Sequence, residues 1–248
     1  MIKFFRKIRQ NLLSEGKTGK YLKYAIGEII LVVIGILIAL QINNWNEEKK
    51  NQKLVSNILY DLMSDLKKDS IDLAYHVKYS EQELSRHNLI IDRARNKGAT
   101  LDTLVFLGKN EFQPHWVAPL NYNSTTFQSI KSSGKLELLS DSIKKEIIVF
   151  YNKIGYYESI LNELNAQYRR SLHEFSQHFI LNKGLDYEYL ARVISWENID
   201  KKEFVLKFDA LLTLRKLLWD YYYESLKKQQ KRNESVMKLI KKELKENR

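Results

Sequence analysis

The chain has 248 residues, of which 44% are hydrophobic and 29% charged, a balance that suits a folded protein of one or two domains. It contains no cysteine, which excludes disulfides, thiolate metal sites and a cysteine nucleophile, and it carries a net charge of +11. Two prolines and nine glycines are few for this length, so we predict an all-α fold of long helices.

The net charge lies at the two ends of the chain. Residues 1–23 hold seven Lys or Arg and one Glu, giving +6, and residues 224–248 hold nine Lys or Arg and four Glu, giving +5. A neutral body with basic ends suits anionic lipid headgroups better than a nucleic-acid backbone. We therefore expect a membrane and no nucleic acid among the partners.

The first 23 residues alternate aromatic or aliphatic with basic side chains. Phe4, Phe5 and Ile8 recur at near-helical spacing with Arg6 and Lys7 between them. This pattern is typical either of a short amphipathic helix on a membrane surface or of an unstructured basic region before a membrane span. Both interpretations place residues 1–23 in the cytoplasm.

The next segment is the most apolar part of the chain. Residues 24–42 contain one ionisable side chain, Glu28, and residues 29–40 contain no polar side chain. As a helix, residues 24–45 are roughly 31 Å long, close to the thickness of the hydrocarbon core. We predict a transmembrane helix over residues 24–45. A cleaved signal peptide is the alternative, although no small-x-small cleavage site follows the apolar run.

The charges on the two flanks of this span predict its orientation. Seven basic residues precede it, whereas Glu47, Glu48, Lys49 and Lys50 follow it and balance one another. Because positive charge is retained in the cytoplasm, we expect the N-terminus inside and residues 46–248 outside.

Small residues lie on one face of the predicted span. Gly27, Gly35 and Ala39 follow one another at multiples of four residues, and such a face permits close approach of a second helix. We therefore predict a homo-oligomer formed through this face. The alternative is that these residues face lipid.

Two stretches carry a resemblance to a known family. They are the opening MIKFFRKIRQNLLSEGKTGKYLKYAIGEIILVVIGILIALQINNWNEE and residues 127–151, FQSIKSSGKLELLSDSIKKEIIVFY. Both are similar to recurrent segments of an uncharacterised family of single-pass membrane proteins from Bacteroidota, known only as a domain of unknown function. The resemblance implies a bacterial inner-membrane anchor with a helical periplasmic region, and it supplies no catalytic residue and no substrate.

After the span, residues 46–97 predict a long helix that ends at Asn96, Lys97 and Gly98. The segment lacks proline and glycine before Gly98, and nothing separates it from the span. Its apolar stripe has coiled-coil-like steps of three, four or seven residues and consists of Val55, Leu59, Leu62, Leu66, Leu73, Val77, Leu84 and Ile91.

Residues 98–134 have no regular pattern apart from a predicted short helix over residues 125–132, with a capping box of Thr125 and Gln128 and a stop at Gly134. The preceding loop is the candidate binding surface, because loops on a rigid scaffold often carry function. The alternative is that its tryptophan plugs the end of the bundle. The loop residues concerned are Pro114, His115, Trp116 and Pro119.

Three further helices are predicted, over residues 141–183, over residues 186–194 and from Asp200, which has the spacing of a capping box with Glu203. With residues 46–97 they form an elongated antiparallel bundle. Polar residues 227–235 interrupt the last apolar stripe, so the C-terminal part either packs on the first helix or forms a separate helix.

No cofactor or metal site is expected from the sequence. His173 and His178 are five residues apart and His76 and His87 eleven, and neither spacing favours a shared metal. The tyrosines at 156, 157 and 221–223 are interpreted as core residues rather than a stacking site.

Two classes of function remain. The first is a membrane-anchored, non-enzymatic helical module that binds a protein partner or ligand outside the cytoplasm. The second is a membrane-anchored enzyme whose catalytic residues are dispersed along the sequence. Polar residues within the apolar stripes would favour the enzyme, and few are expected.

Overall fold

The computed structural model describes residues 18–181, 190–197 and 199–246, and within them every regular element is helical. The predicted all-α fold is confirmed. Packing of the Cα trace divides the chain into two compact units, Met1–Asn57 and Ile58–Arg248. The elements are α2 (Thr18–Ala94), α3 (Leu101–Phe106), the π-helical η1 (Leu107–Glu111), α4 (Thr125–Ser132), the 3-10 helix η2 (Lys135–Leu138), α5 (Asp141–Ser176), α6 (Leu190–Glu197) and α7 (Lys201–Glu246).

The described part of the first unit is the N-terminal portion of α2. An 18-residue window in this portion has a mean hydropathy of 2.6, and none of it is buried. Among the described residues, α2 is the one helix long and apolar enough to cross a membrane. It continues without a break to Ala94, so the prediction that the span and the following helix form one continuous helix is confirmed. The interpretations of residues 1–17 lie outside the described residues.

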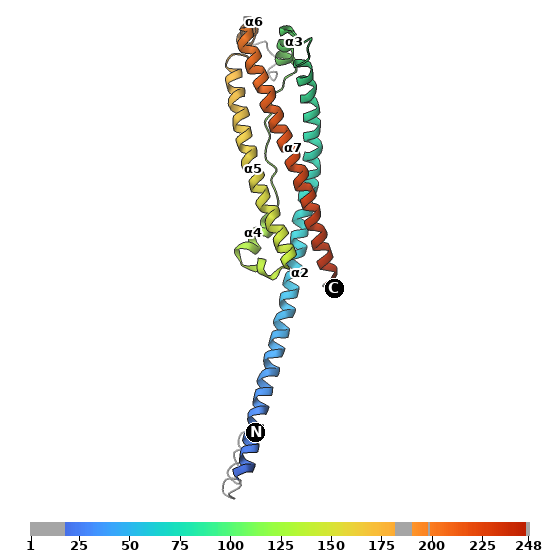
Figure 1. The fold of residues 1–248 in the computed structure, drawn as a ribbon, viewed down its shortest axis with the longest axis vertical. Helices are drawn as coiled ribbons and strands as arrows, with labels where there is room; N and C mark the ends of the chain where they lie inside the picture. Colours follow the sequence, from blue (N-terminus) through green and yellow to red (C-terminus); the bar gives the residue numbers. More distant parts are fainter. Residues whose placement is uncertain (1–17, 182–189, 198, 247–248) are drawn as a thin grey trace. The chain divides into compact units, whose positions relative to one another are not determined.

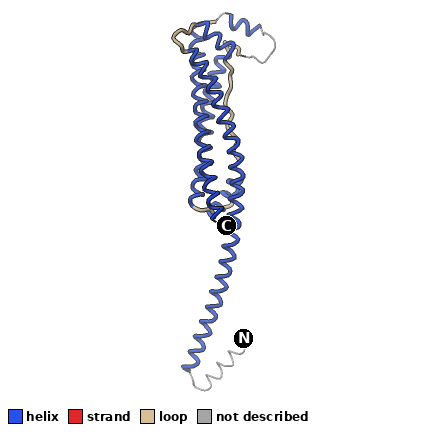
Figure 2. Tube along the Cα trace, turned by 90° about the vertical axis from the view of Figure 1, so that its right-hand side faces the viewer, coloured by secondary structure: helices blue, strands red, loops and turns tan. Residues whose placement is uncertain are grey.

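The second unit is a bundle of three long helices, namely α2 from Ile58 onward, α5 and α7, which lie side by side (Figures 1 and 2). Hydrogen bonds join α2 to α7 at three levels: Asn233 Nδ2 donates to the Leu66 carbonyl at 3.1 Å, Tyr222 Oη lies 3.0 Å from His76 Nδ1, and His87 Nε2 lies 2.8 Å from the Leu212 carbonyl. Later residues of α2 therefore meet earlier residues of α7. The predicted antiparallel pairing is confirmed for the residues after Ile58.

The predicted apolar stripes form the core of this bundle. On α2 the side chains of Leu59, Leu62, Leu66 and Leu73 are fully buried. Aromatic rings fill the far end, where the Phe175 ring lies 6.0 Å from those of Phe204 and Phe208. Burying such a side chain contributes about 1.5–3 kcal/mol, so these stripes dominate the stability of the unit. Further core residues from the other two helices are Ile143, Ile147, Phe150, Ile154, Leu161, Leu211 and Leu218.

Two predicted helix boundaries need correction. α5 ends at Ser176, before the predicted residue 183, and α6 continues to Glu197, beyond the predicted end at residue 194. The predicted start of that helix at residue 186 lies outside the described part of the chain, which omits residues 182–189. α7 is one helix to Glu246, because Gln229 and Asn233 occupy core positions at the spacing of Leu226, Val236 and Ile240 and are themselves buried. The polar stretch thus continues the buried face of the helix.

Residues 98–111, expected to be irregular, contain two short helices. Thr100 caps α3 and shares a capping box with Thr103, which the sequence analysis overlooked. Gly108 in η1 packs against α7 so closely that an added Cβ would lie 3.2 Å from the Phe204 ring. This contact fixes η1 on α7.

Residues 112–124, which we call the strap, run in an extended conformation along the bundle (Figure 2). The Asn165 side chain on α5 holds the strap, because its Oδ1 accepts from the Val117 amide at 3.1 Å and its Nδ2 donates to the Val117 carbonyl at 2.7 Å. At the end of the strap, Asp69 Oδ1 accepts hydrogen bonds from both the backbone and the side-chain nitrogen of Asn123. The strap is thereby fixed to α5 at Val117 and to α2 at Asn123.

The predicted helix over residues 125–132 is confirmed as α4, and Gly134 follows it with a φ of 72°. The predicted capping box of Thr125 and Gln128 is wrong, since the N-cap residue is Ser124 and no side chain within α4 caps the helix. Asp65 on α2 takes that role, and its Oδ2 accepts from the Thr126 amide at 3.3 Å. Because the cap comes from a distant residue, no local spacing could have indicated it.

Candidate functional site

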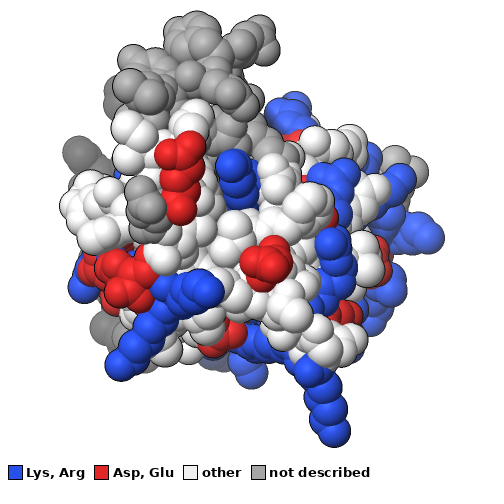
Figure 3. Space-filling view, turned by 90° about the horizontal axis from the view of Figure 1, so that it is seen from above, with Lys and Arg blue, Asp and Glu red and all other residues white. Residues whose placement is uncertain are grey.

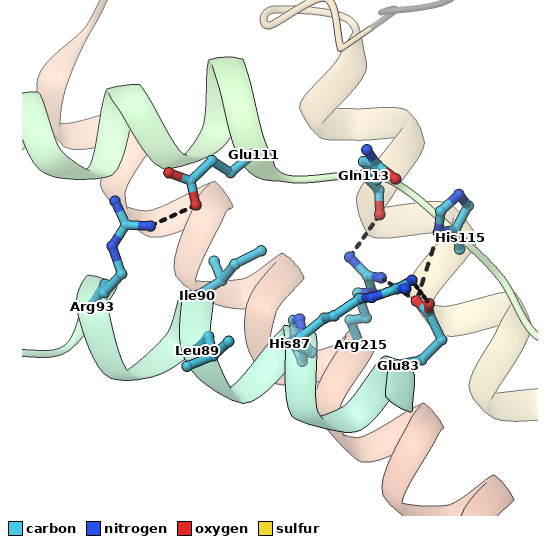
Figure 4. Close-up of a pocket in the computed structure, with 10 residues that line it drawn as sticks. Glu83, His87, Leu89, Ile90, Arg93, Glu111, Gln113, His115 and Arg215 are labelled. Carbon is cyan, nitrogen blue, oxygen red and sulfur yellow. Dashed lines mark hydrogen bonds and ion pairs between the residues drawn. The ribbon is translucent and has the colours of Figure 1, made fainter. Parts of the chain in front are cut away.

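An open groove of about 470 Å³ lies in the second unit between α2, η1, the start of the strap and α7 (Figure 4). Its volume lies within the range of small-molecule sites. It is lined by Glu83, Arg86, His87, Leu89, Ile90, Arg93, Glu111, Gln113, His115 and Arg215.

One end of the groove is built on a buried ion pair. The side chains of Glu83 and Arg215 are each 4% exposed, and Arg215 Nη2 lies 3.5 Å from Glu83 Oε2. Arg215 Nη1 also donates to the Gln113 carbonyl at 2.6 Å, and its guanidinium lies over the Phe112 ring. Removing either partner of such a pair leaves an uncompensated buried charge. The pair therefore fixes the strap, α2 and α7 relative to one another.

Burial lowers the pKa of the Arg215 guanidinium, and the nearby Tyr168 and Glu83 raise it in opposition. An arginine starts from so high a pKa that it remains charged. On the other oxygen of Glu83, Oε1 accepts from Arg86 Nη1 at 2.6 Å. Arg86 is 72% exposed, so the same carboxylate links a buried guanidinium to one on the rim.

His87 lies beside this ion pair and is 1% exposed. Its Nε2 lies 2.8 Å from the Leu212 carbonyl, which can only accept, so Nε2 carries the proton. Its Nδ1 is buried and has no hydrogen-bond partner. Burial lowers the pKa of His87 to about 4, with further lowering from Arg215 and Lys216. The ring is therefore neutral at pH 7.

The rim of the groove is charged and its middle is apolar. Arg93 Nη1 lies 2.6 Å from Glu111 Oε2 at one end, and His115 Nδ1 lies 3.9 Å from Glu83 Oε2 at the other (Figure 4). Leu89, which is 63% exposed, and Ile90 lie between these ends. The groove thus combines an exposed apolar floor with a guanidinium at each end, Arg93 beside Glu111 and Arg86 beside Glu83.

The chemistry of these ten residues favours binding over covalent catalysis. They include no hydroxyl, thiol or amine that could act as a nucleophile. Among the described residues no group of three or more His, Cys, Asp or Glu could hold a metal ion. The groups that the groove offers to a ligand are carboxylates, guanidiniums, imidazoles, an amide and apolar side chains.

The four loop residues singled out in the sequence have different surroundings. His115 lines the groove, whereas Trp116 is 59% exposed and its ring lies 5.6 Å from the Arg169 guanidinium. The interpretation that Trp116 plugs the bundle is wrong, because its side chain is exposed and the buried residues of the strap are Phe112, Val117 and Leu120. Pro119 borders a separate cavity of about 20 Å³, and Pro114 is half-buried outside the groove lining.

The small-residue face of the predicted span belongs to the first unit. Gly27, Gly35 and Ala39 are all exposed, and a Cβ added at Gly27 or Gly35 would meet nothing within 4 Å. This face is therefore open to another helix or to lipid, and association through it stays a prediction.

The histidine pairs and the tyrosines have individual partners within the bundle. His173 Nε2 lies 3.1 Å from Gln177, and His178 Nε2 lies 3.6 Å from Glu203. Tyr222 is buried in the core, as interpreted from the sequence, whereas Tyr156 is 54% exposed.

Most groove residues were not predicted from the sequence, because they occupy positions at which the helical pattern predicts core packing. Arg215 follows Leu211 and precedes Trp219 by four residues each, so it falls within the apolar stripe of α7. The expectation that few polar residues occupy the stripes is wrong, since eight polar side chains are buried in the described part of the chain. The eight side chains are those of Asp69, Ser80, Glu83, His87, Arg215, Ser225, Gln229 and Asn233. A charged residue within an apolar stripe was the signal in the sequence that could have indicated the groove.

Comparison with known proteins identifies a family. The model of a family of unknown function, DUF6090, matches residues 28–214, which is more than half of the chain. No curated protein and no solved structure matches the chain.

Proposed function

We propose that this chain, which belongs to the family of unknown function DUF6090, is a membrane-anchored helical module that binds a ligand or a protein partner outside the cytoplasm. The anchor is the apolar part of α2, which is long enough to cross a bilayer. Its flanking charges favour a cytoplasmic N-terminus and a periplasmic C-terminus. The resemblance to single-pass proteins of Bacteroidota supports a bacterial inner membrane as the location.

The observation that carries the binding role is the groove lined by Glu83 and Arg215. Its charged groups are already held by ion pairs before any ligand arrives, so little side-chain freedom is lost on binding. Its exposed apolar floor offers area that a ligand can remove from water. Both features support recognition and require no chemical step.

A dispersed active site is the second candidate, and two observations favour it. The first is the set of eight polar side chains buried in the described part of the chain. The second is that His115 and Glu83 lie 3.9 Å apart in the groove, an arrangement of a base and its orienting carboxylate. However, Glu83 already accepts from Arg86 and pairs with Arg215, which weakens it as a partner for His115. An activity that appears in a substrate screen and is lost in the His115→Ala variant would favour this candidate.

The binding role is tested by identifying the molecules that co-purify with the protein from its native membrane. The full chain is purified in mild detergent as wild type, Leu89→Trp and Ile71→Trp, and bound molecules are identified by mass spectrometry. Leu89 lies in the groove, whereas Ile71 on the same helix is 72% exposed and outside it. We expect a stoichiometric molecule with wild type and Ile71→Trp that is lost with Leu89→Trp. Its absence from all three proteins, or equal recovery from Leu89→Trp, contradicts the proposal.

A further inference from the structure

The two exposed guanidinium groups of the groove share a face of α2. Arg86 and Arg93 are seven residues apart, which is two turns and about 10 Å along the helix. They are 72% and 49% exposed, and Leu89 lies between them. A ligand lying along the groove therefore meets a positive charge, an apolar side chain and a second positive charge in succession.

Each of these guanidiniums is held in place and still has donors to offer. Arg86 is held by Glu83 Oε1 and Arg93 by Glu111 Oε2, each at 2.6 Å through one nitrogen. A guanidinium carries five N–H donors in a planar fork that matches a carboxylate. Among the described residues, neither side chain makes a hydrogen bond to a second acceptor group. An incoming carboxylate can thus bind at each end without breaking an existing pair.

The charge of the groove favours a ligand of negative charge. Its three arginines exceed its two glutamates, and both glutamates are already paired with arginine. A cationic ligand would meet Arg86 and Arg93 at the rim, and like charges repel at this range. An acidic ligand is therefore favoured.

We propose that the groove binds a small dicarboxylic acid, with one carboxylate on Arg86, the other on Arg93 and an apolar link over Leu89. This inference rests on the proposed binding function and names its ligand class. Figure 4 shows the Arg93–Glu111 and Glu83–His115 pairs at the two ends of the apolar stretch, so the space between them suits a short ligand. A polypeptide would have to continue past both pairs, so a small molecule fits better.

The test measures binding of suberate, an unbranched dicarboxylate, to the full chain in detergent by calorimetry. Arg86→Gln and Arg93→Gln each remove one guanidinium, and we expect each to weaken suberate binding at least tenfold. Arg95→Gln is the matched control, because Arg95 is about as exposed as Arg93 (44% against 49%) but pairs with Asp209 and Thr213 outside the groove. It should change the affinity less than twofold. Thermal melts check that all variants fold.

Ligand analogues complete the test. Octanoate, which keeps the apolar chain and has one carboxylate, should bind at least tenfold more weakly than suberate, and the corresponding diamine should not bind. Failure of suberate to bind, equal binding of octanoate, or an equal loss in Arg95→Gln overturns the inference. So does an acidic peptide that binds more tightly than suberate. If a molecule of other chemistry is nevertheless recovered from native membranes, the binding function stands and the dicarboxylate assignment alone fails.

Discussion

Burial of the His87 ring links the stability of the bundle to pH. Its pKa is about 4 in the folded chain and about 6.5 when exposed, so between these values the unfolded chain binds a proton that the folded chain does not. The contribution of His87 is complete above pH 6.5 and is lost as the pH falls toward 4. At about 1.4 kcal/mol per pH unit, this loss is about 3 kcal/mol.

We therefore expect the His87→Gln variant to lose less stability than wild type between pH 6.5 and 4. The free energy of unfolding is measured by denaturant titration, followed through the fluorescence of the buried Trp219. Burial raises the pKa of Asp69, which acts in the opposite direction but equally in both proteins. His173→Gln, at an exposed ring, is the control. Parallel pH profiles for wild type and His87→Gln would contradict this account of His87.

The Asn165 side chain has a measurable role in holding the strap. It makes both hydrogen bonds to Val117, each worth about 1 kcal/mol, so Asn165→Ala should cost about 2 kcal/mol of stability. Hydrogen exchange of residues 112–123 should accelerate accordingly. Asn121→Ala changes an exposed amide of the strap and should have no such effect. Unchanged exchange in Asn165→Ala means that the apolar contacts of Val117 and Leu120 hold the strap alone.

At this scale the sequence revealed local contacts and missed distant ones. Asp200 was predicted as a helix cap, and its Oδ1 accepts from the amides of Lys202 and Glu203. The cap of α4 by Asp65, the hold of Asn165 on Val117 and the pairing of Glu83 with Arg215 join residues 48 or more positions apart. Such pairs form only when the helices pack together, and the spacing of residues along the sequence does not predict which helices pack.

At the scale of helices and turns, replacing two glycines with alanine should have opposite effects on the free energy of unfolding. Gly134 ends α4 with a φ of 72°, which an L-residue adopts at a cost of about 1–2 kcal/mol. Gly155 lies within α5, is exposed, and has no atom within 4 Å of an added Cβ. Gly134→Ala should therefore lower the unfolding free energy by about 1 kcal/mol, and Gly155→Ala should raise it by about as much.

Denaturant titration of the two variants side by side checks this pair. A stabilised Gly134→Ala would mean that the turn before η2 tolerates another conformation. A destabilised Gly155→Ala would point to a contact of α5 outside the bundle, since the bundle itself leaves that position open.

The long helices were predictable because their stripes repeat over many turns, whereas their ends and interruptions were not. Residues 227–235 of α7 look like a break because they are polar, yet Gln229 and Asn233 keep the spacing of the core. Asn233 satisfies its donor on the Leu66 carbonyl, which explains how a polar side chain is tolerated there. α3 and η1 escaped prediction because each is shorter than two turns of a stripe.

Several properties of the whole molecule remain predictions from sequence. The end of the molecule that carries α3 and α6 shows Lys and Arg interspersed with Asp and Glu (Figure 3), which gives a nucleic-acid backbone no uniform basic face there. The predicted domains of residues 1–23, 24–45 and 46–248 are divided where the chain is expected to enter and leave a bilayer. The boundary after residue 45 falls inside the continuous helix α2.

Self-association through the span is one such prediction. Because Gly35 leaves the helix surface open, Gly35→Ile should block close approach of a second span and reduce the dimer fraction at least tenfold in detergent. Val33→Ile, on another part of the same helix, is the control. Cross-linking followed by gel electrophoresis measures the fraction. The same oligomer in both variants would assign this face to lipid.

The central claim, a groove outside the cytoplasm that binds a ligand, is tested most directly by thiol labelling. The chain has no cysteine, so Leu89→Cys and Ile71→Cys each carry a single thiol, in the groove and outside it. A membrane-impermeant maleimide is added to intact cells and, separately, to the purified and dialysed proteins. We predict that Ile71→Cys is labelled at similar rates in both, whereas Leu89→Cys is labelled at least tenfold more slowly in cells because a ligand covers it. Absence of labelling at Ile71→Cys in cells would contradict the topology, and equal rates for Leu89→Cys would contradict the occupied groove.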